Sequence, residues 1–77
     1  MNTATTTLGS IRFMTEAAHI ECYLTHCDLT EPPYTLVEQH VKGNHNFVMT
    51  HFDNVNEAAD AYEAAAERVK SSIHKAL

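Results

Sequence analysis

The stretch from Asn54 to Leu77 has the composition of one long helix, and it constrains the fold more than any other part of the chain. It contains no glycine or proline and few β-branched residues, so its intrinsic preference is helical. Asn54 is a favourable N-cap residue, and Glu57 three positions later completes the pattern of a capping box. Apolar residues recur at steps of three and four, which predicts one apolar stripe along the helix. The stripe consists of Val55, Ala58, Ala59, Tyr62, Ala65, Ala66, Val69, Ile73 and Leu77.

Three segments before this helix have the pattern of β-strands. From Ala18 to Thr25, apolar and polar residues alternate as in a half-buried strand. Tyr34 to Lys42 and Phe47 to Phe52 are rich in valine and aromatic residues, and the turn-forming residues 43–46 separate them. The sequence therefore predicts the α+β class, with a three-stranded antiparallel sheet and the C-terminal helix packed on one face.

The N-terminal part is less regular. Residues 1–9 are polar and rich in threonine, and we expect a flexible or irregular leader. Residues 10–77 are expected to form a single α+β domain, because 77 residues are near the lower limit for one self-sufficient core. Residues 11–18 fit the spacing of a strand and that of a short helix. A strand with a bend near Ala17 is slightly favoured, and both interpretations stay open.

The predicted sheet has apolar residues on both faces. Tyr34 and Leu36 lie on one face of their strand, whereas Val37 and Val41 lie on the other. A sheet covered by one helix usually has one apolar and one polar face, so a second cover is expected. It is either the N-terminal segment folding back, or a second copy of the chain or a partner protein; alternatively, the register assigned to the strands is misplaced.

Charge and composition limit the class of partner. Ten acidic residues against five lysines and arginines give a net charge of −5 at pH 7, which repels phosphate backbones. We therefore expect no direct nucleic-acid binding and a basic protein surface as partner. No apolar run approaches the roughly 18 residues of a membrane span, and the N-terminus lacks the features of a secretory signal. Two cysteines are too few for a disulfide framework, so a cytoplasmic location is expected.

The helix carries a row of carboxylates on the side opposite its apolar stripe. At about 100° per residue, these acids fall within roughly a third of the helix circumference and span about 15 Å. They are Glu57, Asp60, Glu63 and Glu67. Such a row offers negative charge to a basic groove in place of phosphates, so we predict that it binds the partner. Glu38 and Asp53 are predicted to extend this surface, and Glu21 and Glu31 are further acids that could join it.

No motif indicates catalysis. The chain contains no G-x-S-x-G, no glycine-rich phosphate loop and no H-E-x-x-H, so we expect a protein that is not an enzyme and needs no cofactor. His19, Cys22 and His26 are residue types that bind zinc. On a strand, His19 and Cys22 point to opposite faces, whereas on a helix all three would share a face. A small metal-binding module therefore remains an alternative that requires a helical segment.

The hairpin from Tyr34 to Phe52, the capped helix from Asn54 to Leu77, the acidic row and the small size together resemble phage-encoded inhibitors of bacterial defence, of the anti-CRISPR type. The resemblance implies a nucleic-acid mimic that binds a CRISPR-associated nuclease or complex subunit and blocks its basic surface or its recruitment of other subunits. The order of elements also resembles double-stranded-RNA-binding domains. That class carries a cluster of basic residues at the start of its last helix. Here the corresponding residues 56–60 are Asn-Glu-Ala-Ala-Asp, which contain no basic residue, so the second resemblance is disfavoured. A homodimeric structural or adaptor protein that uses the second sheet face is the alternative from another class.

Overall fold

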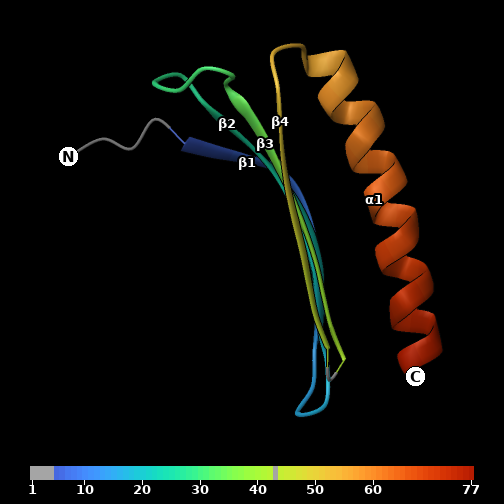
Figure 1. The fold of residues 1–77 in the computed structure, drawn as a ribbon. Helices are drawn as coiled ribbons and strands as arrows, with labels where there is room; N and C mark the ends of the chain where they lie inside the picture. The colour runs from blue at the N-terminus through green and yellow to red at the C-terminus, as the bar shows by residue number, and fades with distance from the viewer. Residues whose placement is uncertain (1–4, 43) are drawn as a thin grey trace.

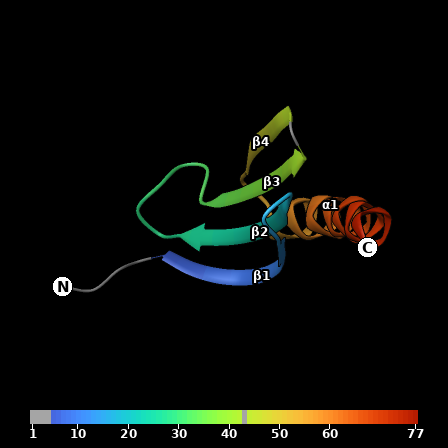
Figure 2. The ribbon, with the colours of Figure 1, turned by 90° about the horizontal axis from the view of Figure 1, so that it is seen from below.

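The protein, described here by a computed structural model over residues 5–42 and 44–77, is a four-stranded antiparallel sheet with one helix on one face (Figure 1). Its elements in chain order are β1 (Thr5–Met14), β2 (His19–Cys27), β3 (Tyr34–Lys42), β4 (Asn44–Phe52) and α1 (Val55–Ala76). The strands lie in the order β1-β2-β3-β4, so each pairs with its neighbour in sequence (Figure 2). The predicted α+β class is confirmed. The sheet has four strands where three were predicted, and the extra one is β1, the N-terminal strand that the sequence left open.

β1 begins at Thr5, inside the segment predicted as an irregular leader; residues 1–4 lie outside the described part of the chain. Thr5, Thr6 and Thr7 are β-branched, which favours a strand in spite of their polarity. The register between β1 and β2 shifts between Thr7 and Gly9. A Cβ atom on Gly9 would lie 3.0 Å from Cζ of Tyr62, so glycine lets this ring pack closely on the strand.

The strand interpretation of residues 11–14 and the predicted bend near Ala17 are both confirmed. Between β1 and β2, the hydroxyl oxygen of Thr15 accepts hydrogen bonds from the backbone N–H groups of Ala17, at 3.2 Å, and Ala18, at 3.0 Å. The backbone N–H of Thr15 donates to the carbonyl of Ala18 at 2.8 Å. These bonds satisfy the turn locally, so the chain reverses and β1 pairs beside β2. The described N-terminal residues therefore do not fold back across the second face of the sheet.

The β3–β4 hairpin matches the prediction for β3 and extends it for β4. Pairing runs without interruption from Tyr34 opposite Phe52 to Lys42 opposite Asn44. The predicted turn over residues 43–46 is shorter in the structure, because β4 already begins at Asn44. Gly43 lies outside the described residues.

The N-cap of α1 is the one that the sequence predicts. Asn54 has extended backbone angles, φ −111° and ψ 129°, and its side-chain oxygen accepts from the N–H groups of Asn56, at 2.7 Å, and Glu57, at 3.2 Å. These bonds satisfy two of the N–H groups that the first helical turn leaves without a partner. The helix continues to Ala76 without a break, and the N–H of Leu77 donates to the carbonyl of Ile73 at 3.1 Å.

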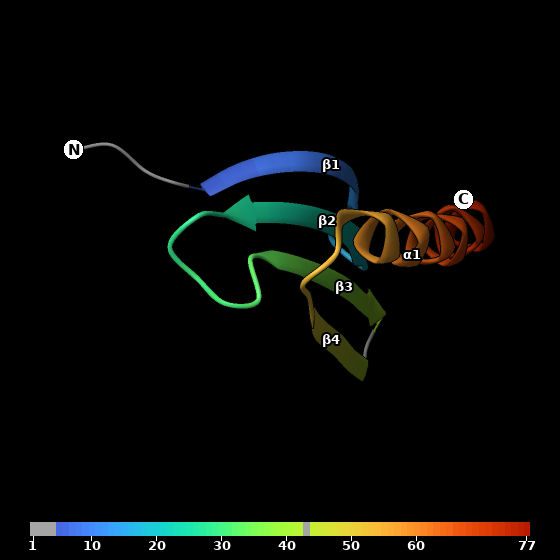
Figure 3. The ribbon, with the colours of Figure 1, turned by 90° about the horizontal axis from the view of Figure 1, so that it is seen from above.

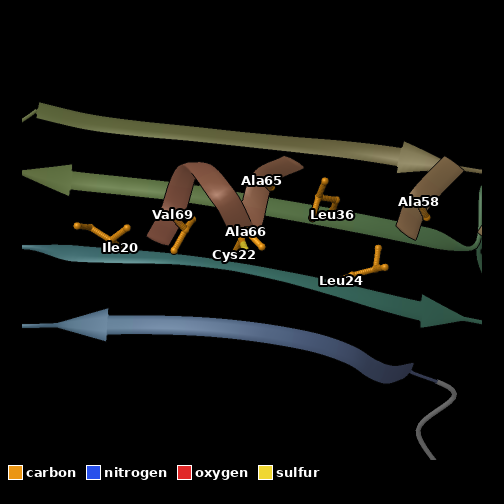
Figure 4. Close-up of a cluster of buried hydrophobic side chains, with 8 residues drawn as sticks. All are labelled: Ile20, Cys22, Leu24, Leu36, Ala58, Ala65, Ala66 and Val69. Carbon is orange, nitrogen blue, oxygen red and sulfur yellow. The ribbon is translucent and has the colours of Figure 1, made fainter. Parts of the chain in front are cut away.

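The core lies between α1 and the two central strands, β2 and β3. α1 runs along the sheet (Figure 1), and the view from above shows it beside these strands (Figure 3). Its members are Ile20, Cys22, Leu24, Leu36, Ala58, Ala65, Ala66 and Val69 (Figure 4). Three of the four helix residues in this core are alanines, and Ala58 and Ala65 are fully buried. Because an alanine side chain is one methyl group, the helix backbone can approach the sheet closely.

The face of the sheet away from α1 carries no helix in the described part of the chain. At the end where β1 begins, the sheet bends away from α1, so this open face is concave (Figure 1). Val37 lies on the open face and is only 2% exposed.

No helix within residues 5–42 and 44–77 combines the length and apolarity required to cross a bilayer.

Candidate protein-interaction surface

The structure brings the predicted acidic row together on the outward face of α1. Glu57, Asp60, Glu63 and Glu67 are all exposed, whereas the buried helix residues lie about half a turn away around the axis. Among the described side chains, the one cation within 4.0 Å of this row is Lys70, whose Nζ lies 3.8 Å from Glu67 Oε1. The negative charge of the row is therefore largely uncompensated within the described residues. We name these four residues the acidic row.

Asp53 lies at the end of the acidic row that begins with Glu57. It is exposed, in the short connection between β4 and the N-cap Asn54. Acidic groups at this end are favoured electrostatically by the positive end of the helix dipole. The same interaction favours Glu57, the acidic residue of the first helical turn.

Glu38 was predicted from the sequence to extend the acidic row, but in the structure it does not join that row. It lies on β3, on the face that α1 covers, and its side chain is 11% exposed. Arg68 binds both carboxylate oxygens of Glu38: its Nε lies 3.2 and 2.9 Å from them, and its Nη2 lies 2.7 Å from Oε1. Hydrogen bonds from Arg68 hold the pKa of Glu38 below its ordinary value, although burial acts in the opposite direction. Glu38 therefore offers no free negative charge to a partner.

Glu38 also belongs to a chain of contacts that the sequence did not indicate. His40 Nε2 lies 2.8 Å from Glu38 Oε2, and His40 Nδ1 lies 3.0 Å from Ser72 Oγ. This hydroxyl–imidazole–carboxylate order is the one that activates serine in many hydrolases. Here the Ser72 backbone lies within a helix, whose N–H groups are used in helical bonds and cannot bind an oxyanion. Arg68 already compensates the negative charge of Glu38, so we interpret the contacts of Ser72, His40 and Glu38 as a polar link between α1 and β3.

Replacing Glu38 by glutamine is expected to lower the free energy of unfolding at pH 7 by about 1–2 kcal/mol. Charge-assisted hydrogen bonds are lost, but Arg68 is 58% exposed and water compensates part of the loss. The pKa of Glu38 is lowered on folding, so its stabilisation is complete above the ordinary carboxyl pKa, about 4.3, and is lost as pH falls through the lowered folded value.

Urea denaturation from pH 2 to pH 8 measures this effect. The difference between the parent and Glu38→Gln should be present at pH 8 and should shrink in acid. The exposed Glu16→Gln serves as the control and should follow the parent. A difference that persists unchanged at the acid end contradicts the ion-pair interpretation.

Glu21 and Glu31, the further acids that the sequence suggested for this surface, both lie away from α1. Glu21 lies on the open face, opposite to α1, and is 8% exposed. Its carboxylate accepts hydrogen bonds from Arg12 Nε and Gln39 Nε2, each at 3.1 Å, and lies 3.1 Å from His19 Nε2. It cannot extend the acidic row. Glu31, in contrast, is exposed, but it lies in the β2–β3 connection.

The segment that carries His19, Cys22 and His26 is the strand β2, so the helical geometry that a metal site required is not present. His19 points to the open face, whereas Cys22 and His26 point to the face under α1. In the described part of the chain, no three histidine, cysteine, aspartate or glutamate side chains are arranged to hold a metal ion.

The two cysteine thiols lie in different environments. Cys22 is fully buried, and burial raises the pKa of its thiol. Cys27 is partly exposed, and hydrogen bonds from the backbone of Leu29 and the side chain of Thr5 lower the pKa of its thiol. Both cysteines are free. Because Cys27 and its neighbour His26 point to opposite faces of β2, His26 is not placed to act as a base for this thiol.

Comparison of the chain with protein-family models, with curated protein sequences and with solved structures finds no match.

Proposed function

We propose that this protein is a non-catalytic binding module that presents the acidic row of α1 to a basic surface of a partner protein. One observation carries the proposal: Glu57, Asp60, Glu63 and Glu67 are exposed together on the helix face directed away from the core. Within the described residues, these acids contribute little to the fold, because the core lies on the other side of the helix. A surface of this kind attracts cationic partners over about a Debye length and speeds their encounter.

The partner class follows from the spacing of the charges. Four carboxylates over about 15 Å give roughly one negative charge per 4–5 Å of helix axis. One strand of DNA carries a phosphate about every 3.4 Å, so a groove that binds a phosphate backbone meets a comparable density of charge. The function that this supports is inhibition of a nucleic-acid-binding protein by occupation of its basic groove. CRISPR-associated effector complexes are the particular targets that the resemblance to anti-CRISPR proteins suggests, and we place this activity in the cytoplasm.

A charge-matched pair of variants tests the proposal. One variant removes three charges from the acidic row, by Asp60→Asn, Glu63→Gln and Glu67→Gln. The other removes three exposed charges elsewhere, by Glu16→Gln, Asp28→Asn and Glu31→Gln. Both variants have a formal net charge of −2, because −5 + 3 = −2. They therefore separate the position of the charges from their total.

Inhibition of DNA binding is the readout, measured by fluorescence anisotropy with purified bacterial nucleic-acid-binding proteins, including CRISPR-associated complexes. We expect the row variant to need about 10- to 100-fold more protein for half-inhibition, equivalent to about 1.4–2.8 kcal/mol of lost binding. The matched variant should inhibit like the parent, and the inhibition by the parent should weaken with added salt. Equal losses from both variants, or no inhibition of any complex by the parent, would contradict the proposal.

A further inference from the structure

The outer edge of β4 has an apolar character that the acidic row does not explain. β4 is at one end of the strand order, so only one of its sides pairs with another strand of the sheet. Phe47, Val48 and Met49 are 48%, 49% and 51% exposed. Successive side chains of a strand point to opposite faces, so a layer on one face cannot cover all three. A further strand in the plane of the sheet covers both flanks at once.

The other edge of the sheet, β1, differs in a way that matters for pairing. β1 contains a register shift between Thr7 and Gly9 and carries Arg12, whose side chain is 65% exposed. Bulges and charged side chains on edge strands prevent pairing with further strands. β4 contains no aspartate, glutamate, lysine or arginine, and its register with β3 runs without a bulge. The edge of β4 is therefore the one that remains suited to pairing.

We propose that a second copy of this chain pairs with β4 in antiparallel orientation, about a two-fold axis that passes through Val48. Val48 is the middle residue of Asn44–Phe52, so all nine residues of each strand find a partner. In this register Val48 lies opposite the partner's Val48, and Phe47 lies opposite the partner's Met49. The axis is perpendicular to the sheet, so the product is a continuous eight-stranded sheet with both helices on the same face.

Self-complementarity and charge favour a second copy over a foreign strand as the occupant. The two-fold axis places apolar residues opposite apolar residues on both faces, and Asn46 opposite the partner's Thr50. The net charge of −5 opposes self-association elsewhere on the molecule, but β4 carries no formal charge. On the helix side, Val48 lines an open groove beside α1 of about 850 Å³, which leaves room for the side chains of a paired strand.

The area of contact predicts a reversible dimer. Nine residues at about 3.4 Å each give an edge of about 30 Å, and a sheet about 10 Å thick then buries roughly 300 Å² per copy. This total of about 600 Å² is below the 1,200–2,000 Å² of stable complexes. The dimer is therefore expected to dissociate on dilution in the micromolar range.

Sedimentation equilibrium from about 1 to 500 µM tests the proposal, with Val48→Lys as the disrupting variant and Ser10→Lys as its control. Val48→Lys places two lysines opposite each other across the axis, with Cβ atoms about 5 Å apart, and like charges directly opposite are destabilising, so we expect at least tenfold weaker dimerisation. Ser10→Lys adds the same charge to β1, at an exposed position, and should dimerise like the parent. Both side chains are exposed, and thermal unfolding followed by circular dichroism verifies that each variant is folded.

A mixing experiment tests the register itself. Val48→Lys and Val48→Glu should each be mainly monomeric alone, whereas an equimolar mixture should form a heterodimer, because opposite charges then face each other on the axis. The proposal is overturned if the parent is monomeric up to 500 µM, if Val48→Lys dimerises like the parent, if Ser10→Lys is equally disruptive, or if the mixture stays monomeric. The residues of the acidic row lie on α1 and are unchanged in these variants, and the proposed function is tested separately by the inhibition of DNA binding.

Discussion

Replacing Ile20 by alanine is expected to lower the free energy of unfolding by about 2–5 kcal/mol. Ile20 is fully buried, with 0% of its surface exposed, and it lies on the central strand β2 beneath α1 (Figure 4). Truncation removes three carbon atoms from a packed core, and the cavity that remains adds to the lost transfer free energy. In a domain of 77 residues this is a large part of the total stability.

Urea denaturation followed by circular dichroism measures the effect of Ile20→Ala, and thermal unfolding should show a fall in Tm of at least about 10 °C. Leu8→Ala is the matched control, because Leu8 lies on β1 and is 50% exposed. It should change the unfolding free energy by well under 1 kcal/mol. If the two truncations were equally destabilising, the core would not lie between α1 and the central strands.

Enlarging Ala65 to leucine is expected to destabilise the protein by about 1–3 kcal/mol, although leucine is a good helix former and more apolar than alanine. Ala65 is 0% exposed on the face of α1 that touches the sheet. A larger side chain there must force α1 away from β2 and β3 or adopt an unfavourable rotamer. The outcome therefore reports how closely the helix approaches the sheet.

The control for Ala65→Leu is Ala59→Leu, which introduces the same side chain on the same helix at an exposed position. Its unfolding free energy should stay within about 0.5 kcal/mol of the parent. Chemical denaturation of the two variants side by side measures the difference. If Ala65→Leu melted like the parent, the interface between α1 and the sheet would be looser than the structure shows.

Local patterns predicted most of the secondary structure. The N-cap at Asn54 and the helix that follows, the strand from Tyr34 to Lys42, and the alternation of Ile20, Cys22 and Leu24 all appear as expected. β1 was harder to predict, because Thr5–Thr7 are polar and the register shift before Gly9 interrupts the alternation. The glycine at position 9 is explained only by the close approach of Tyr62, a residue of α1 that lies more than fifty positions later in the chain.

The candidate surface was predictable where it depends on one helix, and unpredictable where it depends on contacts between elements. The sequence by itself determined that Glu57, Asp60, Glu63 and Glu67 share a helix face, because a helix has a fixed angular step. Only the tertiary structure decided that Glu38 is compensated by Arg68, thirty residues away, and that β4 is an edge of the sheet. Pairing between distant residues depends on how α1 crosses the strands, and no local spacing of residues contains that information.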